Sequence, residues 1–242
     1  MDKRFGGGLT LSGSYVFSKL ISDTDSYGID GNARDHYRLY LEKSIGAIDV
    51  PHNFKLSYIY DLSFGKGKKY LGGGPASVVL GGWRFAGIHR YASGTPIALG
   101  NSVSFPIFNG GNRADVTTLE NWVNDPPNPG WRGDTRFFNS PCTFSVCNAA
   151  GQPVQPTDML GGAPRFNGHA RNRAALTENF PLAKTFAFTE QIRMDFRWEM
   201  LNAFNRVRLA TGSTNIQDPN FGKVTSQLND LRRMQFALKL YF

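Results

Sequence analysis

Two short stretches of the sequence contain residue types that could do chemistry. Asp49 and His52 are close enough in the chain to serve as an acid and a base, but no G-x-S-x-G stretch or other nucleophile accompanies them. The run GKGKKY, residues 65–70, has the glycine and lysine content of a phosphate-binding loop but lacks its third glycine, and we expect no helix after it. We therefore expect local hydrogen bonds from the first pair, a tight turn from the second, and no enzymatic activity.

Metal and thiol chemistry are the other possibilities. Four aspartates lie near two glycines in an irregular stretch, but the spacing misses the calcium-binding EF-hand loop: Asp23, Asp25, Asp30 and Asp35, with Gly28 and Gly31. We expect a solvated loop there, with no metal and no cofactor. Cys142 and Cys147 form either a local disulfide or two unpaired thiols, and the stretch around them lacks the partners of a zinc site.

The composition favours an all-β protein. Charged residues make up 19% of the chain and aromatic residues 13%, and no apolar run approaches the eighteen or so residues of a membrane helix. The net charge is +8, but lysine and arginine are scattered, so nucleic-acid binding is not expected. Abundant aromatic residues and glycine without a helical span are typical of a transmembrane β-barrel.

Alternation of side chains supports this interpretation. One stretch places an apolar row on one face of a strand, which we expect to contact lipid: Ile192, Met194, Phe196, Trp198 and Met200. The opposite face of that strand is fully charged and is expected to face a lumen: Arg193, Asp195, Arg197 and Glu199. The last stretch of the chain repeats the apolar row: Phe236, Leu238, Leu240 and Phe242. A face this charged does not fit a protein core.

The whole chain is therefore expected to form about six antiparallel strands of an up-and-down transmembrane barrel. The strands are predicted near residues 7–18, 53–64, 80–93, 183–201, 206–215 and 232–242. Long extracellular loops at 19–50 and 94–182 alternate with short periplasmic turns at 65–75 and 202–205. Because transmembrane barrels start at eight strands, six strands predict part of a larger barrel.

Four stretches resemble the C-terminal barrel of TonB-dependent outer-membrane transporters, in particular the Oar-like group. They are DVPHNFKLSYIYDLSFGKGKKYL (49–71), GGWRFAGIHRYASGTP (81–96), RMDFRWEMLNAFNRV (193–207) and DPNFGKVTSQLNDLRRMQFALKLYF (218–242), in family order. The resemblance implies active nutrient uptake in the outer membrane. It also implies partners: outer-membrane lipid, the remaining strands and a plug domain, TonB, the barrel-assembly machinery and a small nutrient ligand. The terminal row ending at Phe242 resembles the signal that this machinery reads.

Three expectations remain open at this stage. The start, MDKRFGGGLT, shows no secretory signal, so we expect a portion of a longer protein. Aromatic residues of the second long loop form either a ligand platform or a self-packed loop: Trp122, Trp131, Phe137 and Phe138. The alternatives to a transporter are a passive or structural outer-membrane barrel without a plug, and a secreted glycan-binding β-sandwich.

Overall fold

The computed structural model describes residues 2–5, 7–24, 35, 37–65, 68–70, 72–100, 102, 113–124, 136–156, 160–189 and 191–242. These residues form an all-β structure with one short α-helix, which confirms the predicted fold class. The helix is α1 (Pro75–Leu80), which lies soon after residues 65–70, where no helix was expected. Two 3₁₀ turns, η1 (Leu39–Glu42) and η2 (Pro141–Thr143), lie in long connections. No described helix has the length and apolarity needed to cross a membrane.

One antiparallel sheet contains most of the strand residues. Its order is β1-β2-β5-β6-β9-β10-β11, so strands that follow one another in the sheet also follow one another in the chain. The strands are β1 (Asp2–Phe5), β2 (Leu9–Phe17), β5 (His52–Asp61), β6 (Trp83–Ala92), β9 (Ala175–Ala187), β10 (Arg193–Leu201) and β11 (Arg233–Tyr241). Two small sheets pair β3 (Ile21–Ser22) with β4 (Ser44–Ile45), and β7 (Pro96–Ile97) with β8 (Asn167–Arg171). This is an up-and-down arrangement, not the two stacked sheets of a sandwich.

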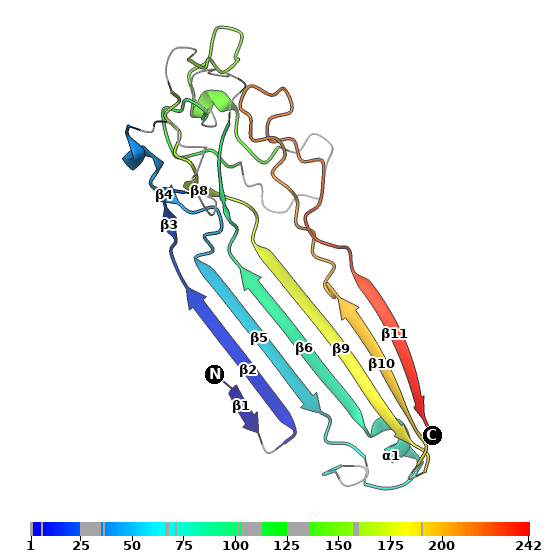
Figure 1. Ribbon diagram of the computed structural model, residues 1–242. Coiled ribbons are helices and arrows are strands. Elements are labelled where there is room, and N and C mark those ends of the chain that lie inside the picture. Colours follow the sequence, from blue (N-terminus) through cyan, green and yellow to red (C-terminus); the bar gives the residue numbers. More distant parts are fainter. Residues whose placement is uncertain are drawn as a thin grey trace.

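The connections divide between the two ends of the sheet. The short turns, α1 and the end of β11 lie at one end, and the long connections gather at the other (Figure 1). We call the described parts of 18–51, 93–174 and 202–232 the outer loop assembly. The expected alternation of long and short connections is therefore present, and the last strand ends at the short-turn end.

Two predicted strands were wrong. The prediction 183–201 merged two strands, β9 and β10, which meet in a hairpin where Phe188 N–H donates to Ile192 O (3.0 Å). Pro181 makes β9 difficult to recognise from the sequence, because proline cannot donate a backbone hydrogen bond to a neighbouring strand and normally argues against an interior strand. Here the ladder tolerates it: β6 pairs with β9 on both sides of Pro181, and Glu199 of β10 lies opposite it.

The stretch 206–215 does not join the main sheet either. Its backbone bonds to the loop that follows: Ala210 N–H donates to Ser226 O (3.0 Å), and Arg208 N–H donates to Asn229 Oδ1 (2.7 Å). The predicted turn at 202–205 consequently lies at the outer end, not the short-turn end. The turn itself is real, because Asn202 and Asn205 both adopt left-handed backbone angles, with φ of 49° and 51°.

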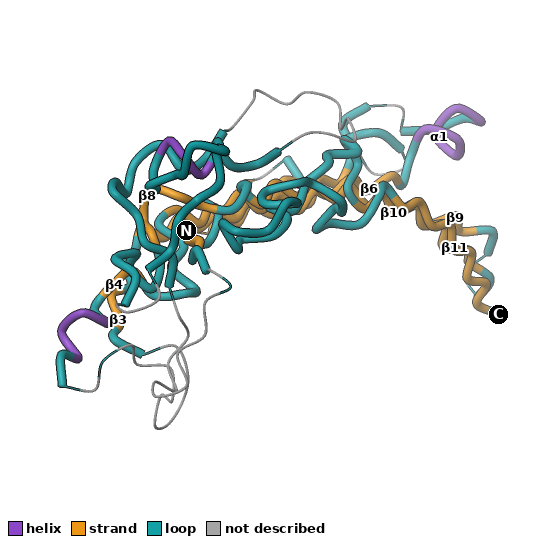
Figure 2. Tube along the Cα trace, turned by 90° about the horizontal axis from the view of Figure 1, so that it is seen from above, coloured by secondary structure: helices purple, strands orange, loops and turns teal. Residues whose placement is uncertain are grey.

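The sheet is bowed and has two chemically different faces. Residues paired across the ladders share a face, so Trp83, Lys184 and Phe196 lie on one side, the aromatic face. Arg84, Ala183 and Arg197 lie on the other, the polar face. Lys184 and Trp83 bind α1, which places α1 on the aromatic side, and α1 lies outside the bend of the sheet (Figure 2). The polar face is therefore the concave one.

The buried core lies in the outer loop assembly, not on the sheet. It comprises Ile97, Leu99, Ala114, Trp122, Phe137, Phe138, Phe144, Ala163, Ala170, Leu209, Ile216, Phe221 and Val224. These residues come from two of the long connections, so the second and third long connections fold together. Loops that share a buried core have a defined shape, and a defined shape can serve recognition.

Candidate functional site

The charged row of β10 lies on the concave polar face. Arg197 Nε contacts Glu199 Oε1 at 2.6 Å, as expected for opposite charges two residues apart on one strand face. Asp195 instead accepts a hydrogen bond from Thr185 Oγ1 (2.8 Å), and the Arg193 guanidinium lies 4.3 Å from the centre of the Tyr241 ring. These groups are water-accessible, so their pairing fixes side-chain positions more than it stabilises the fold.

A hollow of about 410 Å³ lies on the same face. Its floor consists of small or aliphatic residues, among them Ile59, Ala86 and Ala183. Arg84 and Arg197 stand on either side of Ala183 in one register row, and Arg84 Nε binds Asp61 Oδ1 at 2.7 Å. An apolar floor between two guanidiniums can bind a group that is partly apolar and partly anionic.

The apolar row of β10 lies on the aromatic face. Met194, Phe196, Trp198 and Met200 pair in register with Leu240, Leu238, Phe236 and Met234 of β11. Trp198 and Phe236 stack with ring centres 5.7 Å apart. Ile192, the first member of the predicted row, precedes β10 in the hairpin, and Phe242 follows β11. A continuous apolar ladder of this kind is typical of the outward band of a transmembrane barrel.

Of the two alternatives for the aromatic residues of the second long loop, the self-packed loop holds for every member that the structure describes. Trp122, Phe137 and Phe138 are 1%, 1% and 2% exposed, and Trp131 lies outside the described residues. Phe138 stacks on Phe221 with ring centres 4.8 Å apart, and Trp122 Nε1 donates to Thr118 O (2.9 Å). The aromatic residues pack the loops on themselves because burying rings in the loop core removes a large apolar area from water.

Cys142 and Cys147 form a disulfide, with Cα atoms 5.4 Å apart. They are the only cysteines of the chain. The bond closes the small loop beside η2, next to the buried Phe144. The predicted pairing is confirmed.

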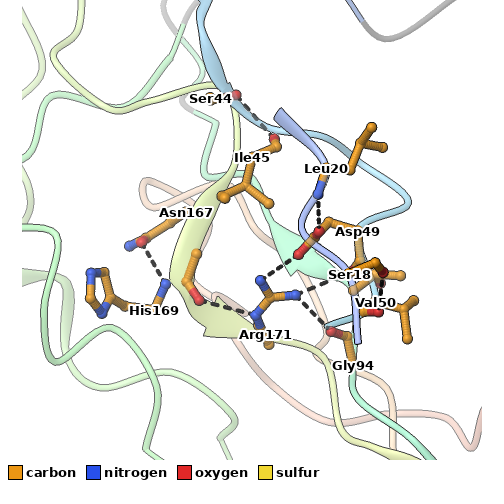
Figure 3. Close-up of polar contacts among 12 residues, drawn as sticks. Ser18, Leu20, Ser44, Ile45, Asp49, Val50, Gly94, Asn167, His169 and Arg171 are labelled. Carbon is orange, nitrogen blue, oxygen red and sulfur yellow. Dashed lines mark hydrogen bonds and ion pairs between the residues drawn. The ribbon is translucent and has the colours of Figure 1, made fainter. Parts of the chain in front are cut away.

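Asp49 and Arg171 form a buried ion pair between two of the long connections (Figure 3). Arg171 Nη2 binds Asp49 Oδ2 at 2.7 Å, and the Asp49 side chain is 0% exposed. Asp49 Oδ1 also accepts Leu20 N–H at 2.5 Å. Arg171 further donates to the carbonyls of Asp49, Gly94 and Gly168 at 3.1–3.2 Å. One arginine therefore ties the first long connection to both ends of the second.

This arrangement also answers whether Asp49 and His52 act together. The Asp49 carboxylate is occupied by Arg171 and Leu20, while His52 Nδ1 pairs with the Tyr15 hydroxyl at 2.7 Å. The His52 ring additionally contacts Phe17, with ring centres 5.2 Å apart. The two side chains serve different contacts. Both make hydrogen bonds as expected, but the bonds are not local, because the partners lie 29, 122 and 37 residues away in the chain.

A second buried pair was missed by the sequence analysis. Arg206 Nε binds both carboxylate oxygens of Glu178, at 2.8 and 3.0 Å, and the Glu178 side chain is 0% exposed. Ala203 N–H donates to Glu178 O (2.8 Å), and Phe204 packs edge-on against Phe180. The pair fastens the third long connection to β9. The sequence feature that could have identified this pair is the Asn-Ala-Phe-Asn turn at 202–205, which was predicted at the short-turn end of the sheet. A third such pair joins Arg113 to Glu42 of η1.

No three described His, Cys, Asp or Glu side chains lie together in a way that could hold a metal ion. A search of curated proteins and a search of solved structures each found no match to the chain. A family described as "Outer membrane beta barrel domain" matches residues 1–235, nearly the whole chain. The chain therefore belongs to this family of outer-membrane β-barrel domains, and the membership indicates the outer membrane as its location.

Proposed function

We propose that the chain is the C-terminal part of the barrel of a TonB-dependent, Oar-like outer-membrane transporter that takes up a nutrient actively. The observation that carries the proposal is the charged, hollowed concave face beneath a folded outer loop assembly. A barrel whose inner wall holds ion pairs and a hollow can contact a plug that moves under load. An outer assembly with its own core can present a specific ligand surface.

The open sheet supports a larger barrel. In the described residues, β1 and β11 each pair with one neighbour only. Open edges in lipid would leave backbone groups unsatisfied, so further strands must complete the wall. In the proposed assembly the remaining strands, a plug and TonB act together, and the barrel-assembly machinery inserts the protein by reading the terminal aromatic row. The chain itself performs no enzymatic step.

The proposal assigns the two faces their roles. The aromatic face contacts lipid, and the polar face, with Arg193, Asp195, Arg197 and Glu199, lines the lumen. Support comes from the curvature, because the polar face is concave and α1 lies outside the bend. Barrel lumens are polar and lipid-facing bands are apolar.

Uptake in matched strains tests the proposal. Accumulation of labelled siderophores, cobalamin, glycans and peptides is measured with the intact gene, without the gene, and without TonB. A nutrient whose uptake requires both the gene and TonB would support the transporter. Uptake that needs the gene but persists without TonB would indicate a passive channel, and no gene-dependent uptake would indicate a structural barrel.

A substitution on the polar face connects this result to the structure. Arg197→Ala removes the ion pair with Glu199 at the edge of the hollow. Because lumen substitutions tune selectivity and lipid-face charges impair insertion, the variant should reach the outer membrane in normal amounts but show altered uptake. Arg233→Ala is the matched control, because it removes a largely exposed pair between the start of β11 and Asp230, away from the residues that line the hollow.

A further inference from the structure

Helix α1 places aliphatic side chains in the open on the outer side of the sheet. Val78, Val79 and Leu80 are 65%, 64% and 49% exposed, although the helix lies against the aromatic face. Figures 1 and 2 place it at the short-turn end, outside the bend. Three adjacent exposed aliphatic residues are costly in water and mark a surface with an apolar partner.

The helix is held in this position by two strands. Lys184 of β9 donates from Nζ to the carbonyls of Val78 (2.8 Å) and Val79, and its residue is only 2% exposed. The Lys184 ammonium also lies 5.0 Å from the centre of the Trp83 ring. Trp83 Nε1 of β6 donates to Val79 O (3.1 Å). The carbonyls of Val78 and Val79 are thus satisfied by the sheet, while the side chains of both residues remain exposed.

An apolar groove lies between α1 and the sheet. It measures about 430 Å³ and is lined by Leu62, Phe64, Leu80, Trp83 and Leu182. The groove continues outward through aromatic contacts: Phe64 lies 6.0 Å from Tyr70, and Lys69 Nζ lies 5.3 Å from the Tyr70 ring. The surface therefore changes from aliphatic to aromatic to cationic, the order found from acyl chains to headgroups at a membrane boundary.

We propose that α1 and this groove form an interfacial membrane anchor that binds phospholipid of the periplasm-facing leaflet. Val78, Val79 and Leu80 enter the acyl-chain boundary, the groove holds part of an acyl chain, and exposed Lys69 meets the anionic headgroups. The surface continues the apolar band of an outer-membrane barrel, and short turns face the periplasm in such barrels. The inference rests on the proposed assignment of the aromatic face to lipid. Lys184 is the positioning residue.

Site-specific fluorescence quenching tests the anchor. The two cysteines of the chain are disulfide-bonded, so Val79→Cys introduces the only free thiol of the chain for an environment-sensitive dye. The protein is extracted from outer membranes and reconstituted in phosphatidylcholine–phosphatidylglycerol vesicles. Nitroxides placed high on the lipid acyl chain should quench the dye more than nitroxides placed deep, and aqueous iodide should quench it little. Quenching of Val79→Cys by iodide but not by lipid would overturn the anchor.

Two control positions separate this failure from a failure of the proposed faces. Leu238→Cys lies on the aromatic face of β11 and Ala237→Cys on its polar face. Lipid quenching at Leu238 and not at Ala237 establishes the faces, whatever α1 does. The reverse pattern would refute the face assignment, and with it both proposals.

The role of Lys184 has its own readout. Lys184→Met keeps the apolar stem but removes the ammonium, so the dye at Val79 should lose most of its lipid quenching, while Leu238 keeps its own. Lys184→Arg retains donors and should preserve quenching at Val79. Unchanged quenching in Lys184→Met, with Leu238 still quenched by lipid, would show that Lys184 does not position the helix.

Discussion

Replacing Arg171 by methionine should open the outer loop assembly while leaving the sheet paired. Methionine keeps the apolar stem but removes every donor that reaches Asp49, Gly94 and Gly168. The Asp49 side chain is fully buried and would retain only the Leu20 N–H among the bonds described above. The variant therefore leaves a buried carboxylate without its counter-charge.

The expected magnitude follows from that burial. Breaking a buried ion pair by removing one partner costs about 3–5 kcal/mol, because the remaining charge stays desolvated. If local opening is fast compared with cleavage, the proteolysis rate follows the opening equilibrium. The rate of cleavage within the outer loop assembly should then rise by roughly two to three and a half decades, at 1.4 kcal/mol per decade.

The assay is limited proteolysis of the reconstituted protein, with cleavage sites identified by mass spectrometry. Arg233→Met is the control, because Arg233 pairs with Asp230 where both side chains are largely exposed. Exposed pairs contribute little, so its cleavage rate should match the parent. The double variant Asp49→Asn with Arg171→Met should be less open than Arg171→Met alone, since it also removes the stranded charge. An Arg171→Met rate within a few fold of the control would refute the reasoning.

Three further predictions concern packing and protonation. A Cβ at Gly87 would lie 2.3 Å from Cζ of Tyr58, so Gly87→Ala should lower the free energy of unfolding by about 1–3 kcal/mol, seen as a smaller heat-resistant folded fraction on gels. Adding Tyr58→Ala should restore part of that stability. Phe138→Ala should cost about 3–5 kcal/mol in the outer assembly, seen as faster hydrogen exchange there with unchanged exchange in the strands. Hydrogen bonds from Ser213 and a backbone N–H lower the pKa of Asp218 below its ordinary value. Because its folded pKa is lowered, Asp218 stabilises the folded state above the unfolded pKa of about 3.9, and this stabilisation is lost as the pH falls through the folded pKa. Hydrogen exchange near Asp218 should therefore accelerate in acid, and Asp218→Asn should remove that pH dependence.

The sequence predicted the strands where the alternation of apolar and polar side chains was uninterrupted. The apolar row from Met194 to Met200 and its repeat in β11 are local patterns, because side chains of a strand alternate between faces regardless of what the strand contacts. The same property identified the charged side of β10. Local rules failed at Pro181, where a residue unsuited to a ladder sits inside β9, and at 206–215, where alternation reflects packing of Leu209 into the loop core.

The sequence by itself determined which side chains share a strand face and the outer-membrane character, and it offered the short disulfide as one of two alternatives, since each depends on residues close together in the chain. Only the tertiary structure decided which long-range partners meet. Asp49 and Arg171 are 122 residues apart, and no local pattern marks either one as buried. The same holds for the aromatic residues of the second long loop, whose types fit both an exposed platform and a core. Burial depends on how separate connections fold over one another, and this information lies in contacts between distant segments rather than in any single stretch.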